Sequence, residues 1–441
     1  MIEGSARAMV CHSLNSYGPK ASNNKIKKIQ EKNMKRKVVI TGMGIWSCIG
    51  TSLDEVRDSL YRGKCGIHFV KERMDLGFMS GLCGNVPKPD LKPLLSRNER
   101  QFMPEEAQYA YAATLQALKA ARLDQDYIDS HEVGIIYGND SVAEATVKGI
   151  DKFRQFKNTT ACGSGAIFQS MNSTVTMNLA CLFHLKGMNL TASAACASGS
   201  QSIGLASLLI ADGLQDCVIC GGAQENNLYS VASFDGINAF SKRNDDPRHA
   251  SRPFDRDRDG LVPSGGAATV VLEDYDHAVR RGAPIIAEVV AWGFSGNGDH
   301  ISTPNVEGPA RSLELCLQHG GVDPRDIGYV NAHATSTRAG DGREAEAIAR
   351  VFGDYRVPVT STKGQTGHEM WMAGASEVVY SILMMKNDFI AGNLNFEHPD
   401  EHTACVNVIP ETIEAHFDQF LSNSFGFGGT NSTLIIRNTN K

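Results

Sequence analysis

The sequence predicts an α/β fold built from two similar halves. Short apolar runs that end in glycine or small polar residues alternate with longer helix-like segments, which is typical of α/β proteins. A hydrophobic fraction of 42% with 43 glycines in 441 residues suits a soluble enzyme with many tight turns. The apolar run 284–292 ends in a glycine turn and begins a second series of elements that echoes the first. The echo indicates an internal duplication.

These observations divide the chain into a leader at 1–33, a first half at 34–283 and a second half at 284–441. The leader is polar, ends in a lysine-rich run and lacks the apolar core of a secretory signal. We interpret it as a tag, an upstream mis-start or a disordered tail. The first strand is expected at 38–41, followed by a glycine turn at 42–44 that permits close packing.

Charge and cysteine content narrow the function. A formal charge of -6 argues against nucleic-acid binding, and no run of about 20 apolar residues predicts a membrane span. The 11 cysteines are scattered and odd in number, which favours a reducing, cytoplasmic compartment. Cys217 and Cys220 have the spacing of a redox or zinc pair, but no second pair completes a zinc site. We therefore interpret them as strand residues.

One cysteine stands out from the others. Cys196 lies in a run of small residues between an apolar strand, which starts at Met188, and a buried helix-like segment at 203–211. A helix N-terminus favours a thiolate over a thiol, and small neighbours leave room for a substrate. The pattern predicts a nucleophile, with a buried, inert cysteine as the alternative.

Three later stretches place polar residues at the ends of predicted strands. They contain His333, the pair Lys363 and His368, and the glycine-rich turn 426–431. For each residue taken alone, hydrogen-bonded packing in a loop is the alternative interpretation. Two histidines and a lysine, each among Gly, Ser and Thr, favour a catalytic site.

Four motifs then identify a family. They are Ser193-Ala-Ala-Cys-Ala, His333-Ala-Thr-Ser-Thr, Lys363-Gly-Gln-Thr-Gly-His and Asn423-Ser-Phe-Gly-Phe-Gly-Gly-Thr-Asn. With them, residues 34–437 resemble β-ketoacyl-acyl-carrier-protein synthases of the elongating type, closest to the synthase I and II branch. The resemblance implies a thiolase-like fold, in which two duplicated α/β halves form a layered αβαβα core, and a homodimer.

The resemblance also implies an activity: decarboxylative Claisen condensation of an acyl-enzyme with malonyl-acyl carrier protein, in fatty-acid or polyketide elongation. Cys196 would be the nucleophile that accepts the acyl group. His333 and His368 would stabilise the enolate that forms as carbon dioxide leaves. The backbone N–H groups of Cys196 and Phe427 would form the oxyanion hole, with the Phe427 ring as a gate.

Further roles follow from the same resemblance. Lys363 would tune the charge of the histidine region with Glu344 as its electrostatic partner, unless Glu344 is an ordinary carboxylate on a helix face. Thr335 and Thr337 would hydrogen-bond the phosphopantetheine arm. The acyl pocket would involve Asp140, Met171, Leu261 and Phe425. A basic surface for the carrier protein would comprise Arg97, Arg100, Lys152, Arg154 and Lys157. No cofactor, metal site or nucleic-acid partner is expected.

Three positions depart from the family pattern. Bulky residues, Glu369-Met-Trp-Met, follow His368 where small ones are usual; Leu261 replaces a phenylalanine; and Asn139-Asp140 replaces glycine-rich sequence near the pocket floor. A carboxyl in an alkyl tunnel is costly unless it is paired. We therefore expect an acyl chain that is short, polar, unsaturated or aryl-capped, as in aryl polyene synthesis.

Two other functions are considered. A non-catalytic partner subunit, like the chain-length factors of polyketide synthases, would usually lack the cysteine that is present here. A degradative thiolase would need a second catalytic cysteine near the carboxyl terminus, where the chain has Gly426-Phe-Gly-Gly-Thr. Both comparisons favour the synthase.

Overall fold

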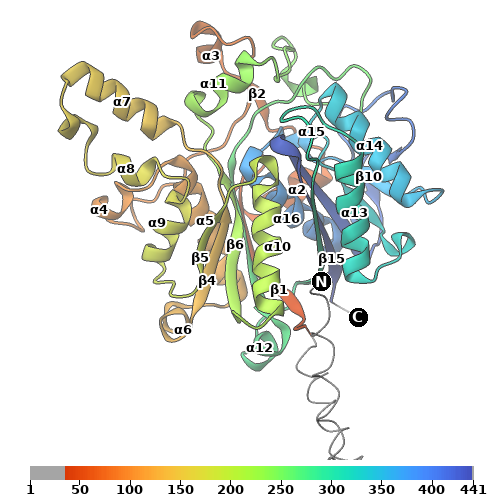
Figure 1. Ribbon diagram of the computed structural model, residues 1–441, viewed down its shortest axis with the longest axis horizontal. Helices are drawn as coiled ribbons and strands as arrows, with labels where there is room; N and C mark the ends of the chain where they lie inside the picture. Colours follow the sequence, from red (N-terminus) through yellow and green to blue (C-terminus); the bar gives the residue numbers. More distant parts are fainter. Residues whose placement is uncertain (1–34, 440–441) are drawn as a thin grey trace, which may run out of the picture. The chain divides into compact units, whose positions relative to one another are not determined.

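A computed structural model describes residues 35–439 of the chain (Figure 1). The predicted leader at 1–33 lies outside this range. The strands are β1 (Val38–Trp46), β2 (Ile67–Phe69), β3 (Leu82–Gly84), β4 (Val133–Gly138), β5 (Asn189–Ala192), β6 (Cys217–Gln224), β7 (Gly266–Asp274), β8 (Ala287–Gly296), β9 (Tyr329–Asn331), β10 (Pro358–Thr360), β11 (Phe389–Ile390), β12 (Asn407–Val408), β13 (Ile413–Glu414), β14 (Gln419–Gly426) and β15 (Thr430–Asn438).

The helices vary from single turns to long segments. The α-helices are α2 (Leu53–Tyr61), α3 (Lys71–Asp75), α4 (Arg97–Arg100), α5 (Glu105–Ala121), α6 (Gln125–Ser130), α7 (Glu144–Phe156), α8 (Ala166–Gln169), α9 (Thr174–Leu182), α10 (Ser198–Ala211), α11 (Leu228–Gly236), α12 (Tyr275–Arg280), α13 (Glu307–Gly320), α14 (Arg338–Phe352), α15 (Lys363–Thr366) and α16 (Ala373–Lys386). Among the 3₁₀ turns, η2 (Ala195–Ala197), η5 (Met370–Met372) and η6 (Phe427–Gly429) bear on the site.

Strand order shows the duplication directly. The first half runs β1-β7-β6-β4-β5 across the sheet, and the second half runs β8-β15-β14-β9-β10, with the additional two-residue strand β12 at the edge beyond β10. Apart from β12, each half contributes five strands. Numbered within its own half, each series has the order 1-5-4-2-3. In both, the first two pairings are antiparallel and the last two are parallel. The predicted pair of similar α/β halves is confirmed.

The two halves join through a short pairing of their first strands. Only Val38, Val39 and Ile40 of β1 pair with β8. Residues 37–439 nevertheless form one compact unit, because helices from both halves pack between the two parts of the sheet. The central helices α10 and α16 contribute Ile203, Ile210 and Val378 to a single buried cluster with residues of β1 and β8.

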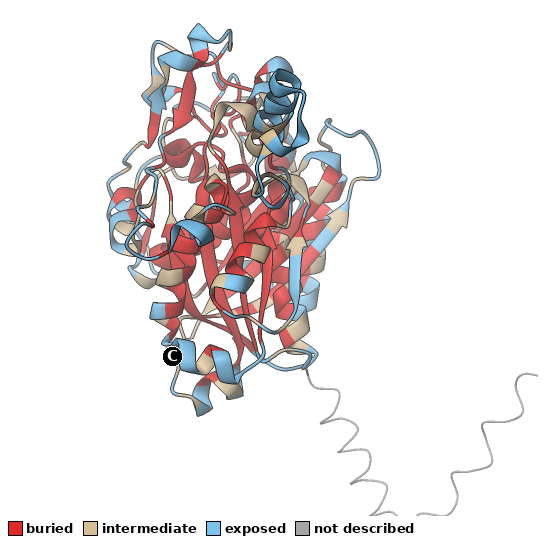
Figure 2. Cartoon of the chain, turned by 90° about the vertical axis from the view of Figure 1, so that its left-hand side faces the viewer, coloured by how far each residue is buried: buried red, intermediate tan, exposed pale blue. Residues whose placement is uncertain are grey.

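Three helical layers enclose the two sheet layers. Helices α5 and α9 cover the outer face of the first half, α10 and α16 lie in the middle, and α13 and α14 cover the second half (Figure 1). The strands at the centre are buried almost throughout, as Figure 2 shows. This is the expected αβαβα arrangement. None of the helices in the described range combines the length and apolar character needed to cross a bilayer.

Gly42 and Gly44 do not form the turn that the sequence predicts after the first strand. Gly42 and Gly44 lie inside β1 rather than in a turn after it, because the strand continues to Trp46. The predicted close packing is present, but it involves the backbone of helix α5. A Cβ on Gly44 would lie 1.9 Å from the Ala113 carbonyl oxygen of α5, and one on Gly42 would lie 2.2 Å from that of Ala117. These glycines let a helix backbone approach the strand closely.

Gly44→Ala is expected to lower the free energy of unfolding by about 3 kcal/mol, since the new methyl group meets helix backbone that cannot rotate away. Urea unfolding of the two proteins measures the difference. Gly149→Ala in α7 is the control, because a Cβ there meets no atom within 4 Å. It should leave stability unchanged or raise it by up to about 1 kcal/mol through helix propensity. Equal effects of the two changes would contradict the packing argument.

Cys217 and Cys220 both lie on β6, as predicted. Cys217 belongs to the buried cluster under α5, whereas Cys220 belongs to the central cluster with α10 and α16. Their side chains therefore lie on opposite faces of the sheet. Both thiols are free.

Candidate active site

The chain turns sharply between β5 and α10, and this turn presents Cys196. Ala195 has a φ of 47°, which is uncommon for a residue with a side chain. Ser198 supports the turn, because its Oγ accepts a hydrogen bond from Ala194 N–H at 2.9 Å and donates to Ala195 O at 2.6 Å. Helix α10 begins at Ser198, so Cys196 lies just before its N-terminus, as the sequence predicts.

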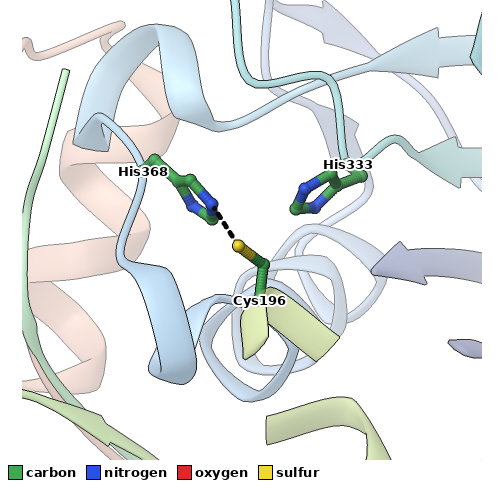
Figure 3. Close-up of side chains that lie close together, drawn as sticks. All are labelled: Cys196, His333 and His368. Atoms are coloured by element: carbon green, nitrogen blue, oxygen red, sulfur yellow. Dashed lines mark hydrogen bonds between the residues drawn. The ribbon is translucent and has the colours of Figure 1, made fainter. Parts of the chain in front are cut away.

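Two histidines from the second half meet the cysteine (Figure 3). Cys196 Sγ lies 3.0 Å from His368 Nε2, and the rings of His333 and His368 are 5.2 Å apart, edge to face. His333 follows β9, and His368 follows α15. Three ligand-type atoms of these residues lie within 4.8 Å of one another, all buried. We interpret the set as catalytic rather than metal-binding, since nucleophile and proton carriers are in contact.

The protonation states differ in one respect from the expectation. Burial raises the pKa of Cys196 to about 12, and the positive charge of Lys363 opposes the shift only in part. The expected preference for a thiolate is therefore wrong for this structure, because desolvation outweighs the helix N-terminus. Burial, followed by the charge of Lys363, holds the pKa of both His333 and His368 well below the usual range. A neutral thiol faces neutral imidazoles.

Lys363 forms its ion pair with Glu377 of α16, not with Glu344. Both partners are buried, and burial raises the pKa of Glu377 to about 8 against the influence of the lysine. The prediction that Glu344 is the partner of Lys363 is thus wrong as far as an ion pair is concerned. Lys363 only contributes a weak electrostatic lowering of the Glu344 pKa.

Glu344 instead holds the backbone of the histidine loop. Its carboxylate accepts hydrogen bonds from the N–H groups of His333 at 2.9 Å and Ala334 at 2.7 Å, and from Asn423 Nδ2 at 3.0 Å. Glu344 is buried, so it is also no ordinary helix-face carboxylate. It is a positioning residue, which fixes His333 relative to β14.

A cavity of about 240 Å³ leads to the three residues. Cys196, His333 and His368 lie in its wall, together with Thr335 and Thr337. The two threonine hydroxyls lie 3.1 Å apart, and both residues line this cavity. The predicted pantetheine residues and the predicted nucleophile therefore share one channel.

Phe427, the predicted gate, lies in the wall of that channel. Its side chain is 42% exposed, and its ring stacks on Phe234 with centroids 6.0 Å apart. Gly426 packs against the cysteine turn, since an added Cβ would lie 3.1 Å from Cys196 N. The sequence analysis missed Phe234. It named Asn423 only as the first residue of a motif, and the resemblance offered Glu377 only as a carboxylate that some family members use near a monovalent cation, so neither the contact of Asn423 with Glu344 nor the ion pair of Glu377 with Lys363 was predicted. Helical spacing in the 373–386 segment places Glu377 on a buried helix, but no local signal selects its partner.

The four predicted pocket residues separate into two groups. Leu261 and Phe425 line the cavity, and Phe425 lies 6.0 Å from the His333 ring. Asp140 and Met171 do not line the cavity in the single chain. The Asp140 carboxylate accepts a hydrogen bond from Ser193 Oγ, and burial raises its pKa. Met171 is exposed at the surface.

The predicted carrier-protein residues lie on helices away from the cavity wall. Arg97 and Arg100 are on α4, Lys152 and Arg154 on α7, and Lys157 caps α7. All are exposed except Arg100, which is half-buried. Helices α4 and α7, which carry these residues, lie on the same side of the molecule (Figure 1).

Glu369 follows His368 and is buried behind it. Its carboxylate accepts hydrogen bonds from Ser376 Oγ at 2.5 Å and Tyr380 Oη at 2.8 Å. Burial raises the pKa of Glu369 to about 7, although both hydroxyls and Lys363 oppose the shift. The sequence singled out this residue only for its bulk.

A raised folded-state pKa makes stability depend on pH. The folded chain holds the Glu369 proton more tightly than the unfolded chain. The free energy of unfolding is therefore highest below about pH 4.5, where both states are protonated, and it falls as the pH rises through about 7. Glu369→Gln cannot titrate, so its free energy of unfolding should fall less between pH 5 and pH 8 than that of the wild type. Urea unfolding across this pH range measures both slopes, with exposed Glu132→Gln as the control. Parallel slopes for wild type and Glu369→Gln would contradict the expectation.

Comparison with known proteins assigns the family. The N-terminal domain of beta-ketoacyl synthases matches residues 35–278, and the C-terminal domain matches residues 286–397. The chain belongs to the β-ketoacyl synthase family. It is 40% identical over 405 residues to 3-oxoacyl-[acyl-carrier-protein] synthase 1 of Escherichia coli (strain K12). The matched region covers 91% of this chain and 99% of that protein. The predicted relationship to the synthase I and II branch is confirmed.

Solved structures of β-ketoacyl synthases agree with the fold. A beta-ketoacyl synthase from Burkholderia phymatum superposes with a TM-score of 0.88 at 37% identity, over 92% of this chain and all of that one. A type II PKS ketosynthase, solved with its acyl-carrier protein, superposes with a TM-score of 0.82 at 26% identity. It covers 92% of this chain and all of that one. The thiolase-like fold class is confirmed.

Proposed function

We propose that the chain condenses an acyl group, held on Cys196, with malonyl-acyl carrier protein to give a 3-ketoacyl product. The observation that carries this proposal is the contact of Cys196 with His368, beside His333, in the wall of a channel lined by Thr335 and Thr337. A nucleophile, two neutral imidazoles and a narrow channel are the parts that the reaction requires.

Acyl transfer comes first. Cys196 gives its proton to His368 Nε2 as Sγ attacks the thioester carbonyl of the acyl-carrier protein. The tetrahedral oxyanion accepts hydrogen bonds from the N–H groups of Cys196 and Phe427. The pantetheine thiolate then leaves and takes the proton back from His368. The products are an acyl thioester on Cys196 and a free carrier protein.

Decarboxylation and condensation follow. Before this step, water in the channel moves the single proton of the neutral His368 ring from Nδ1 to Nε2, so that Nε2 becomes a donor. The bond between malonyl C2 and its carboxylate breaks, carbon dioxide leaves, and the electron pair forms an enolate whose oxygen accepts N–H hydrogen bonds from His333 and His368. The enolate carbon attacks the acyl carbonyl, and the tetrahedral intermediate expels the Cys196 thiolate, which takes up one proton from solvent to restore the thiol. The low pKa of both histidines suits this task, because neutral donors stabilise charge that develops only in the transition state.

The substrates arrive on carrier-protein phosphopantetheine, and we propose no other cofactor. Thr335 and Thr337 are the hydroxyls that face the pantetheine arm in the channel. The exposed basic surface suits an acidic carrier protein, which it would steer toward the enzyme. The type II PKS ketosynthase that shares this fold forms a complex with its acyl-carrier protein, which supports this kind of partner. A cytoplasmic location remains a prediction.

Charge reversal tests the basic surface. Lys152→Glu with Arg154→Glu should raise KM for malonyl-acyl carrier protein about tenfold with little change in kcat, since surface charges act on association. Steady-state kinetics at low salt measures the change, which should shrink as ionic strength rises. Arg311→Glu with Arg325→Glu, two exposed arginines of the second half, is the matched control. A fall in kcat alone would contradict a steering role.

We also propose that the chain forms a homodimer through β5. This strand is the outermost of its half-sheet, and open edges favour pairing with another chain. Large apolar residues are exposed on and near it: Ile167, Phe168, Met171, Met188 and Leu190. A dimer would cover them and bring the partner's Met171 region toward the acyl pocket. A single-chain mass by light scattering would contradict this arrangement.

The decisive test measures the mass of the acylated protein and the 3-ketoacyl product that it releases. Intact-mass measurement after incubation with a panel of acyl-carrier proteins should show one acyl adduct, and addition of malonyl-carrier protein should release a 3-ketoacyl product. Acyl groups that are short, polar, unsaturated or aryl-capped should load faster than long saturated ones. Absence of any adduct would favour a non-catalytic partner subunit, and equal use of long saturated primers would contradict the proposed substrate class.

A further inference from the structure

Trp371 is buried against the nucleophile. The turn η5 packs on η2, and Trp371 belongs to one apolar cluster with Cys196, Leu261 and Phe240. Its side chain is only 6% exposed. The indole therefore belongs to the same apolar cluster as Cys196, although Trp371 is not among the residues that line the cavity of about 240 Å³.

Its indole N–H differs from those of the other tryptophans. Trp46 Nε1 donates to Pro87 O at 2.6 Å, and Trp292 Nε1 donates to Ser432 Oγ at 2.9 Å. The buried Nε1 of Trp371 has no acceptor within the described range 35–439. Two of the three indole N–H groups therefore have a hydrogen-bond acceptor, whereas that of Trp371, which clusters with Cys196, has none in this range.

An unpaired buried donor disfavours a wholly apolar ligand. A ligand that supplies an acceptor removes the cost of the unpaired group, whereas one without an acceptor leaves it in place. Sites built around a buried polar group reject analogues that lack the matching group far more strongly than apolar pockets reject a changed methylene. Trp371 therefore has the means to discriminate between acyl groups.

Aromatic rings surround the same region. The Phe234 ring lies 6.4 Å from Trp371, 6.3 Å from Phe240 and 6.0 Å from Phe427. The last two contacts are stacked, with interplanar angles of 11° and 15°. Flat rings in this arrangement pack best against a planar acyl chain.

We propose that Trp371 determines acyl specificity, and that its indole N–H selects a planar acyl group carrying an oxygen acceptor. This inference rests on the proposed function, because it concerns the acyl group that Cys196 accepts. It narrows the substrate class from polar, unsaturated or aryl-capped chains to planar chains with an acceptor within reach of Trp371.

Matched primers test the proposal. Carrier protein is loaded with cinnamoyl and with 2-, 3- and 4-methoxycinnamoyl groups. Each of the latter adds one methoxy group, whose oxygen accepts a hydrogen bond but cannot donate one. Rates of acylation of Cys196 are followed by intact mass. At least one methoxy isomer should load the wild type about tenfold faster than cinnamoyl. Trp371→Phe should remove most of that preference while retaining a ring, and Trp292→Phe should retain it.

The outcomes separate the two proposals. If no primer, including a saturated hexanoyl control, acylates the wild type, the proposed function fails. If the wild type is acylated but shows no methoxy preference, or if Trp371→Phe keeps the preference, the role of Trp371 fails while the synthase stands. Should Trp371→Phe not fold, the wild-type ratio alone decides.

Discussion

Cys196→Ala is expected to abolish formation of the acyl-enzyme and to lower condensation by about 10³-fold or more. Alanine has no nucleophile, and no other thiol touches His368 among residues 35–439. Intact mass after exposure to acyl-carrier protein measures the adduct, and product analysis measures condensation. The fold should persist, since the change removes one buried sulfur atom.

A partial activity should survive in this variant. His333 and His368 remain in place, so slow decarboxylation of malonyl-carrier protein to the acetyl form should continue. Cys181→Ala, which changes an exposed thiol, is the control and should behave as the wild type. An acyl adduct on the Cys196→Ala protein would show that another residue is the nucleophile.

His333→Ala is expected to lower condensation by about 10²- to 10³-fold while leaving acyl transfer nearly intact. His368 is the imidazole in contact with the thiol, whereas His333 lies beside it and would act only on the enolate oxygen. The acyl-enzyme should therefore accumulate in His333→Ala. Single-turnover measurements, first with acyl- and then with malonyl-carrier protein, separate the two steps.

His368→Ala should slow both steps, which makes it the natural comparison. His333→Asn restores a neutral N–H donor and should recover part of the condensation rate without changing acyl transfer. His249→Ala, an exposed histidine paired with Asp246, controls for loss of an imidazole elsewhere. Equal loss of acyl transfer in His333→Ala and His368→Ala would contradict this division of roles.

Much of the candidate site could be predicted from the sequence, because each part has local chemistry. The small residues around Cys196 predict a tight strand-to-helix turn, and the structure has that turn with Ala195 at positive φ. The stretches around His333 and His368 carry turn residues at strand or helix ends. A weak echo between the halves predicted the duplication, which strand order confirms.

Partners across the fold could not be predicted in this way. Lys363 has two candidate carboxylates, and the choice of Glu377 over Glu344 depends on how α16 packs beneath the histidine loop. The glycines of β1 resemble a turn locally, but they serve contact with α5, which lies about 70 residues away in the chain. Spacing along the chain carries no information about such contacts.

The fold class, the duplication and the family follow from the order of the residues, and so does the choice of Cys196, His333 and His368 as the proposed catalytic residues. The electrostatics of the site follow only from its tertiary surroundings. A helix N-terminus is a local feature and predicts a thiolate at Cys196, but desolvation by elements from both halves raises its pKa to about 12. The same burial leaves the Trp371 N–H without an acceptor among residues 35–439. Protonation and hydrogen-bond satisfaction depend on everything that surrounds a group, and only the folded chain brings those surroundings together.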